Sequence, residues 1–346
     1  MSSAPVTPTQ PGPTTMALPL LDVALSVRLE QRMALVEAAL SDAVLNVDPL
    51  ANDVSRHLLA AGGKRLRPFL VLLSAELGDG ARPEVIDVAI VAELTHLASL
   101  YHDDVMDSAP LRRGAPSAHS VWGNSVAIIV GDLLFARAST RGANLGPEAV
   151  SIQARTFERL CLGQLHETMG PAAGQDPVEH YLSVLSDKTA SLLATSARLG
   201  AMFGGASDDQ VEVVAAFGEQ VGIAFQLADD VLDLSASGVL SGKTPGTDLR
   251  EGVATMPVLL LRQRVAKGQG TADDVALLAA LDGDLSDDDA LAAVVEQLRR
   301  HEVLAETRAL AIEYANRAVA ELEPLPAGPV RSALESFAQV LADRAS

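Results

Sequence analysis

The sequence predicts an all-α protein, a single large helical bundle. Apolar residues recur every three or four positions along most of the chain, which is the spacing of one face of a helix. The alternation of apolar and polar residues that marks strands is almost absent. The chain is 48% hydrophobic but only 3% aromatic, so its core must be built from Ala, Leu and Val, as in closely packed helices.

One domain is expected to occupy residues 18–346. A chain of 346 residues exceeds the size that one core usually serves, yet no linker divides it. Residues 1–17 are rich in Pro, Thr and Ser and lack the basic and apolar regions of a signal peptide, which predicts a disordered tail on a cytoplasmic protein. No apolar run reaches the roughly 20 charge-free residues that span a bilayer, so we expect no transmembrane segment.

Charge and cysteine content exclude several classes of partner and site. The net charge of −19 argues against nucleic acid or anionic lipid as the main partner. Cys161 is the only cysteine, so the chain has no intrachain disulfide and no thiolate metal cage. We expect Cys161 to be a small core residue.

Helix follows helix along the chain. Asp48-Pro49 is a good helix start, Gly62-Gly63 is a break, and Pro68 and Pro83 open the next two segments. The segment from Pro83 ends in an acidic cluster. The other expected helices cover 18–45, 49–60, 68–77, 124–143, 147–169, 177–202, 208–235, 248–263, 271–282, 286–299, 302–322 and 327–344.

A first aspartate motif, Asp103, Asp104 and Asp107, closes the helix that begins at Pro83. Asp103 and Asp107 stand one turn apart on one face, where their carboxylates repel each other. The helix dipole adds about half a negative charge at that end. Such a pair favours a compensating cation, and hard oxygen ligands suit Mg²⁺, which typically binds one or two carboxylates plus substrate phosphates. Arg112 and Arg113 follow and can meet a phosphate that the metal also touches.

A second aspartate motif repeats this spacing at Asp229, Asp230 and Asp233, again at the end of an apolar helical run and before a basic loop, 242–249. An isolated acidic cluster is usually a solvated helix end. Three other clusters begin helical patterns, where the dipole favours acidic residues and no function is needed: Asp208-Asp209, Asp273-Asp274 and Asp287-Asp288-Asp289. The two motifs lie at the opposite ends of their helices, and this contrast indicates a site.

Basic residues occur where an anion would need them. The segment 62–68 places Lys64, Arg65 and Arg67 beside two glycines at the mouth of a helix, which predicts a diphosphate site, although a basic turn on an acidic protein is the alternative. His96 lies two turns before Asp103, where a single histidine is more often a packed core residue.

Lys188 and Thr189 lie within an otherwise apolar helical segment, where such a pair is usually an exposed face. Six aspartates and two diphosphates in one cavity would repel strongly without cations. Two or three Mg²⁺ ions would largely neutralise them together with these basic side chains: Lys64, Arg67, Arg112, Arg113, Lys188 and Lys243.

Taken together, these motifs closely resemble those of the trans-isoprenyl diphosphate synthases, or polyprenyl synthetases. The resemblance runs in order from about Leu18 to the C-terminus, and its pieces are specific only jointly. It implies the isoprenoid synthase type I fold, with helices around a deep central cavity and usually a homodimer. It also implies a reaction in which isopentenyl diphosphate elongates an allylic diphosphate to a trans-prenyl chain and releases diphosphate.

The resemblance also assigns roles residue by residue. The direct Mg²⁺ ligands would be Asp103, Asp107 and Asp229, with Asp104, Asp230 and Asp233 supporting them. Isopentenyl diphosphate would be held by Lys64, Arg67, His96 and Arg113. The allylic diphosphate, or the cation formed from it, would be held by Arg112, Lys188, Thr189, Gln226 and Lys243. The proton lost at the end would go to the departed diphosphate, so no His or Ser base is expected.

Product length depends on the residues four and five positions before Asp103. In the family a bulky aromatic residue there stops the chain early, whereas Ser99 and Ala98 are small. Each further helical turn gives about 5.4 Å, close to one isoprene unit, so we expect a long product of roughly six to ten units, such as a quinone side chain.

Three alternatives remain. One is a shorter-chain, geranylgeranyl-type synthase. A class I terpene cyclase also ionises a diphosphate, but it lacks a second substrate site like the one that Lys64, Arg67 and Arg113 predict. A non-catalytic or regulatory subunit of a heteromeric synthase usually has eroded aspartate motifs, whereas all six aspartates are present here.

Overall fold

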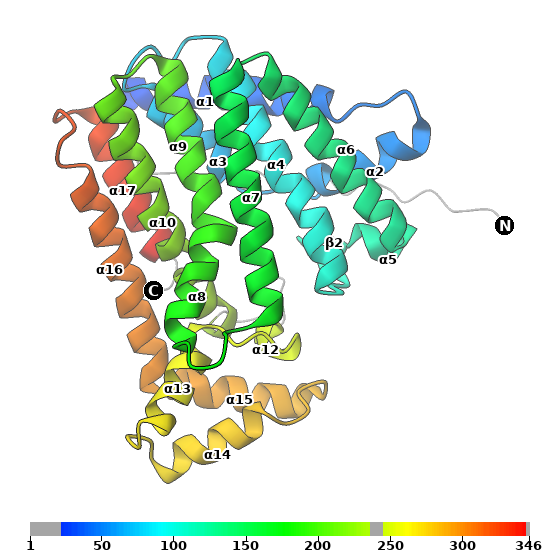
Figure 1. Ribbon diagram of the computed structural model, residues 1–346, viewed down its shortest axis with the longest axis vertical. Coiled ribbons are helices and arrows are strands. Elements are labelled where there is room, and N and C mark those ends of the chain that lie inside the picture. The colour runs from blue at the N-terminus through cyan, green and yellow to red at the C-terminus, as the bar shows by residue number, and fades with distance from the viewer. Residues whose placement is uncertain (1–21, 236–244, 344–346) are drawn as a thin grey trace.

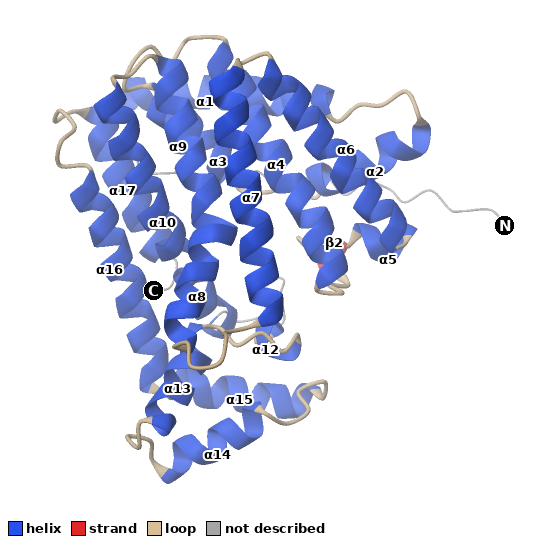
Figure 2. Cartoon of the chain, in the orientation of Figure 1, coloured by secondary structure: helices blue, strands red, loops and turns tan. Residues whose placement is uncertain are grey.

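The computed structural model describes residues 22–235 and 245–343 (Figure 1), and within them it confirms the all-α class (Figure 2). The helices are α1 Val23–Ala43, α2 Pro49–Ala60, α3 Leu66–Ala75, α4 Glu84–Met106, α5 Ala118–Trp122, α6 Asn124–Ala143, α7 Pro147–Met169, α8 Pro177–Leu185, the π-helix η1 Ser186–Ala190, α9 Ser191–Gly204, α10 Asp208–Ser235, α12 Thr247–Arg250, α13 Met256–Ala266, α14 Ala272–Leu281, α15 Asp288–Arg300, α16 Glu302–Glu321 and α17 Pro329–Asp343. One two-stranded hairpin, β1 Leu111–Arg112 and β2 Ala115–Pro116, accompanies them.

Two large hydrophobic cores lie along the described part of the bundle, and α10 belongs to both. The long helices run alongside one another, and α12 to α15 lie across their lower ends (Figure 1). The larger core joins α1 to α6, α9, α17 and the first half of α10, for example Phe217. The smaller core joins α8, α13 to α16 and the second half of α10, for example Leu227 and Val231. The helix that ends in the second aspartate motif is therefore held from both sides.

Several helices, among them α1, α2, α8 and α14, begin where a polar side chain accepts a hydrogen bond from one of their first amide groups. Asp22 accepts from the Leu25 amide of α1 at 2.7 Å, and Asp48 accepts from the Ala51 amide of α2 at 2.9 Å. Thr271 and Asp274 form a reciprocal capping box on α14. The acidic clusters at 208–209, 273–274 and 287–289 do stand at helix starts, as predicted.

Several local expectations were wrong. The segment 248–263 is not one helix, because Gly252 takes a left-handed φ of 78° and a new helix begins at Met256 with Pro257 in its first turn. The segment 177–202 is helical but contains the π-helical turn η1. Neither α5 nor the hairpin was predicted. Cys161 is exposed on α7 rather than buried.

Two of the described helices, α4 and α10, are long and apolar enough to cross a membrane by length and composition. However, 67% and 61% of their most apolar windows are buried inside the protein, as in the core helices of a bundle. The predicted tail, residues 1–17, lies outside the described residues.

Candidate active site

The first aspartate motif sits at the C-terminus of α4. Asp103 is in the last turn, and Asp107 caps the helix, its amide donating to the Asp103 carbonyl at 2.8 Å. Burial raises the pKa of Asp103 to about 6, although the charge of Lys188 opposes the shift. Asp104 is fully buried and accepts a 2.6 Å hydrogen bond from Arg112 Nε. Asp103 and Asp107 therefore lie at the helix end, with Asp104 behind them.

The hairpin after α4 directs the side chains of Arg112 and Arg113, which follow the first aspartate motif, to different partners. Arg113 and Gly114 have positive φ angles of 54° and 77°, as both central residues of a tight two-residue turn require. Arg112 turns to Asp104, whereas Arg113 donates to the Leu58 carbonyl at 3.2 Å and to the Gly62 carbonyl. One short turn thus aims two neighbouring guanidinium groups at different parts of the site.

A basic group forms where the loop before α3 meets the hairpin. Arg67 has a buried Nε without a partner among the described residues, and burial lowers its pKa to about 10. Burial, and then the charges of Arg67 and Arg113, lower the pKa of His96. Arg65 is buried and pairs with Glu93 at 3.0 Å. The structure brings Arg67, His96 and Arg113 together, while Lys64 is exposed on the loop.

The π-helical turn η1 lies between the two aspartate motifs. Burial alone would lower the pKa of Lys188, but the charges of Asp103 and Glu167 raise it. On the neighbouring position, Thr189 Oγ1 donates to Gln226 Oε1 of α10 at 3.3 Å. Turns of this kind are frequent at functional sites. Lys188 thus interacts through its charge with the end of α4, while Thr189 contacts α10 one turn before Asp229.

Glu167, which the sequence analysis missed, forms an ion pair with Lys188. It lies in the last turn of α7, where the helix dipole disfavours an acidic residue. The reasoning that singled out the two aspartate motifs therefore applies to it as well. Gly163, one turn earlier, allows the close approach, because a Cβ there would stand 2.7 Å from the Lys188 amide nitrogen.

The second aspartate motif gives each carboxylate different surroundings. Asp230 is 1% exposed, and its Oδ2 accepts from the Tyr181 hydroxyl at 2.8 Å and from the Met256 amide at 3.2 Å. It thus caps α13 from another helix. Asp233 accepts from the Thr247 amide, the first of α12, at 3.2 Å. Asp229 shares this helix end, and Lys243 lies outside the described residues.

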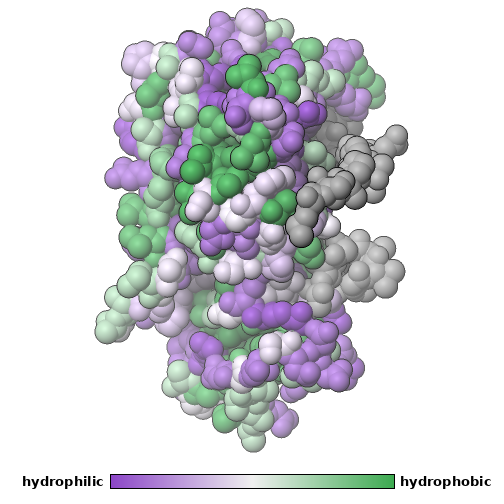
Figure 3. All heavy atoms as spheres, turned by 90° about the vertical axis from the view of Figure 1, so that its right-hand side faces the viewer, coloured by the Kyte–Doolittle hydropathy of each residue, from purple (hydrophilic) through white to green (hydrophobic). Residues whose placement is uncertain are grey.

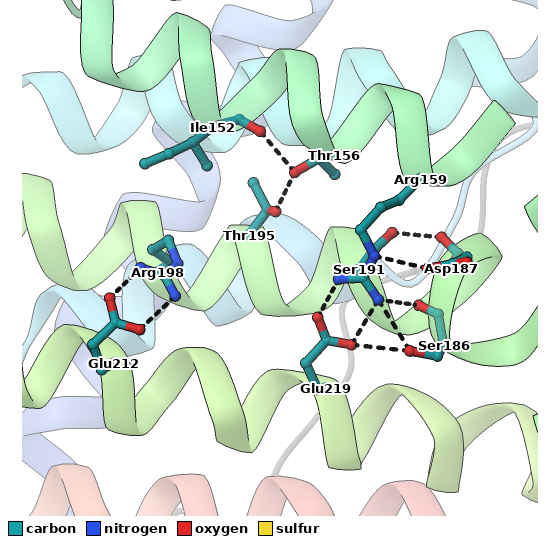
Figure 4. Close-up of polar contacts among 10 residues, drawn as sticks. All are labelled: Ile152, Thr156, Arg159, Ser186, Asp187, Ser191, Thr195, Arg198, Glu212 and Glu219. Atoms are coloured by element: carbon teal, nitrogen blue, oxygen red, sulfur yellow. Dashed lines mark hydrogen bonds and ion pairs between the residues drawn. The ribbon is translucent and has the colours of Figure 1, made fainter. Parts of the chain in front are cut away.

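A groove of about 460 Å³ is lined by residues of α7, α9 and α10, several of which are drawn in Figure 4. Arg159 crosses it, and its Nε donates to Asp187 Oδ1 at 2.8 Å while its other nitrogens reach Glu219. Arg198 pairs with Glu212 in the same groove.

The described carboxylates are compatible with a divalent cation that takes part of its ligands from elsewhere. Among the described residues, no group of three or more His, Cys, Asp or Glu side chains is placed to hold a metal ion alone. Asp103 and Asp107 lie at one helix end and Asp229 at another, so each end offers one or two carboxylates. Mg²⁺ commonly binds that number together with phosphate oxygens and water.

Comparison with known proteins places this geometry in a family context. The family model for polyprenyl synthetase matches residues 48–298. The chain is 42% identical to nonaprenyl diphosphate synthase of Mycobacterium tuberculosis, covering 96% of this chain and 98% of that protein. It is similar to the structure of polyprenyl synthase from Caulobacter crescentus complexed with calcium and isoprenyl diphosphate, with TM-score 0.84, 33% identity and coverage of 94% and 98%. Geranylgeranyl pyrophosphate synthase from Corynebacterium glutamicum, also complexed with calcium and isoprenyl diphosphate, matches with TM-score 0.81, 39% identity and coverage of 94% and 98%.

Proposed function

The chain belongs to the polyprenyl synthetase family, and on that premise we propose that it condenses an allylic prenyl diphosphate with isopentenyl diphosphate to make a long-chain all-trans polyprenyl diphosphate. It is a prenyltransferase. The observation that carries the proposal is the pair of aspartate motifs at two helix ends joined through η1, beside a separate basic group.

Two sets of residues hold the two substrates. The basic group of Arg67, His96 and Arg113, with exposed Lys64 at its edge, receives isopentenyl diphosphate. Arg112, Lys188, Thr189, Gln226 and Lys243 receive the allylic diphosphate. The short distance of Arg112 Nε to buried Asp104 supports this division, because it fixes one guanidinium beside the first motif.

Asp103, Asp107 and Asp229 would hold two or three Mg²⁺ ions, which would supply Lewis acidity for the departure of the diphosphate. The allylic C–O bond breaks, and the diphosphate departs with the electron pair. Thr189 and Gln226 present oxygen atoms to the allylic cation. The isopentenyl double bond attacks its C1, forming the new C–C bond. The resulting tertiary cation then loses a proton to the diphosphate, so no side-chain base is required.

The length of the product depends on the wall beside α4. Ala98 is fully buried in the larger core, whereas Ser99 keeps some accessible surface, and its hydroxyl donates to the His96 carbonyl at 2.9 Å. Ser99 is therefore the better candidate to line the growing chain. The geranylgeranyl-type alternative would require a bulky residue elsewhere to stop the chain early.

Replacing Ser99 with Phe should shorten the product by several isoprene units, since an aromatic ring then stands one turn, about 5.4 Å, from Asp103. Chromatography of the dephosphorylated products measures the length. Ala98→Phe is the companion variant, and it should chiefly destabilise the core by overpacking. An unchanged product from Ser99→Phe contradicts this assignment of the wall.

The proposal extends to a cytoplasmic homodimer, which exposed apolar residues on α6 and α7 support. A regulatory subunit remains the second candidate. Incubating the purified protein alone with farnesyl or geranylgeranyl diphosphate, labelled isopentenyl diphosphate and Mg²⁺ separates the two. We expect incorporation of label into long chains, abolished by chelation of the metal, whereas no incorporation by the protein alone favours the subunit.

A further inference from the structure

Arg159 of α7 binds the first two residues of η1, Ser186 and Asp187 (Figure 4). Its Nη2 donates to the Ser186 carbonyl at 3.2 Å and to Ser186 Oγ at 3.0 Å, and its Nε donates to Asp187 Oδ1 at 2.8 Å. Glu219 of α10 accepts from both terminal nitrogens of the same guanidinium. One planar group therefore fixes η1 to α7 and α10 at once.

This grip acts on the carbonyl that defines the π-helical turn. The Ser186 carbonyl accepts from the Ser191 amide, five residues on, instead of from residue 190 as in an α-helix. Relaxation to an α-helix would shift the register by one residue, and one residue corresponds to about 100° of rotation. Lys188 and Thr189 would then turn relative to the helices that they now join.

We propose that Arg159 is a positioning residue, which holds the π-helical turn so that Lys188 and Thr189 face the ends of α4 and α10. The inference rests on the proposed function, in which those two residues hold the allylic diphosphate. Arg159 acts through Ser186 and Asp187 and is not itself a catalytic residue.

The same groove supplies a matched control. Arg198 of α9 donates to both carboxylate oxygens of Glu212 on α10, at 2.7 Å to Oε2. This ion pair also ties two helices of the groove together, but it contacts neither Ser186 nor Asp187 (Figure 4). A variant of Arg198 therefore tests the loss of an ion pair between helices, and a variant of Arg159 tests the loss of the contacts with η1.

The experiment compares Arg159→Gln, Arg159→Lys and Arg198→Gln in steady-state prenyl transfer. We expect Arg159→Gln to raise the KM for the allylic diphosphate about tenfold and to lower kcat, because charge-assisted hydrogen bonds to η1 are lost. The KM for isopentenyl diphosphate should stay within about twofold, since its basic group comes from α3, α4 and the hairpin. Arg159→Lys should lie between, because an ammonium cannot form the fork. Arg198→Gln should keep the kinetics of the unaltered protein.

Equal kinetics of Arg159→Gln and the unaltered protein, measured per folded molecule, overturn the proposal. An equal rise of both KM values, or the same loss in Arg198→Gln, also overturns it. If Arg159→Gln does not fold, Asp187→Ala cuts only the side-chain bond to η1 and should give the same selective rise. Absence of turnover by the unaltered protein refutes the proposed function instead. In that case, calorimetry of inorganic diphosphate binding in the presence of Mg²⁺ still tests the role of Arg159. Equal affinity of the unaltered protein and Arg159→Gln for diphosphate overturns the proposal.

Discussion

At the scale of single residues, the six aspartates divide by surroundings. Asp104 and Asp230, the middle members of the two motifs, are buried and bonded to other elements. Asp103 and Asp107 stand at the end of α4. The repeated spacing in sequence therefore produces two kinds of carboxylate: some placed towards the site and some that anchor its walls.

Asp103 should make the metal-free protein less stable at neutral pH. Its pKa is about 6 in the folded state and about 3.9 when unfolded, so the stability that its protonated form contributes is present below pH 4 and is lost as the pH rises through 6. Asp103→Asn should therefore raise the free energy of unfolding at pH 8 by up to about 3 kcal/mol.

Urea titrations with chelator at pH 4 and pH 8 measure this difference. The stabilisation should vanish at pH 4, while prenyl transfer is lost at both pH values. Asp107→Asn, at an exposed position, serves as the control and should change stability little. A stabilisation that is equal at both pH values would mean that ionisation of Asp103 is not its cause.

Asp230 should tolerate Asn better than Ala. The Asn carbonyl keeps an acceptor for the Tyr181 hydroxyl and the Met256 amide, whereas Ala leaves both donors buried and unpaired, at a cost of about 1–3 kcal/mol each. Thermal unfolding and the Mg²⁺ dependence of prenyl transfer measure the effect. If Asp230 were a metal ligand, Asn would raise the Mg²⁺ requirement as much as Ala does, contrary to this expectation.

At the scale of elements, Arg113 of the hairpin packs against the loop before α3 at Gly63, where the absence of a side chain leaves room for it. A Cβ on Gly63 would stand 2.7 Å from the Arg113 guanidinium carbon, and φ there is +143°. Gly63→Ala should therefore displace Arg113 and raise the KM for isopentenyl diphosphate about tenfold, with little change for the allylic substrate.

Gly114→Ala is the matched control for this prediction. Its φ is +77°, but nothing lies within 4 Å of the added Cβ. It should cost only about 1 kcal/mol of backbone strain and leave both KM values unchanged. Equal kinetic effects of the two variants would show that strain in the turn, not the position of Arg113, is responsible.

Helix polarity made much of the site predictable from sequence. Aspartates at helix ends stood out because electrostatics disfavours them there, and the same test would have found Glu167. The π-helical turn could not be predicted, because the side chain that contacts its first carbonyl, Arg159, comes from a different helix. The break at 251–255 was missed because apolar residues keep a helical spacing through Gly252. Cys161 was wrongly predicted to be buried, because its sequence neighbours are apolar although it lies on an outward face of α7.

At the scale of the whole molecule, α6 and α7 carry an outward apolar surface. Figure 3 shows the side of the molecule on which α6 lies. Hydrophobic residues gather in the upper half of that view. The exposed apolar side chains of these two helices are Ile128, Ile129, Val150, Phe157, Leu162, Leu165 and Met169. Cys161 lies one turn from Phe157 and one turn from Leu165, on the same face of α7. Surfaces of this kind usually mark association sites.

Leu165→Glu should therefore shift the proposed homodimer towards monomer, because a carboxylate would be buried at the contact. Light scattering coupled to gel filtration measures the mass. Val275→Glu, on α14, is the control, since Val275 is 53% exposed and Leu165 is 54% exposed. A Leu165→Glu protein that keeps the mass of the unaltered protein would exclude this face as the dimer contact.

Both ends of the described chain are built into the larger core. Leu25 of α1 is fully buried, and Phe337 of α17 stacks on Phe69 at a centroid distance of 6.0 Å. Residues 48–298, the stretch that matches the family model, omit both helices. A recombinant fragment of residues 48–298 would leave the apolar surfaces that α1 and α17 cover exposed to solvent, and it should precipitate. The shortest soluble product of a truncated gene should therefore run from the start of α1 to the end of α17.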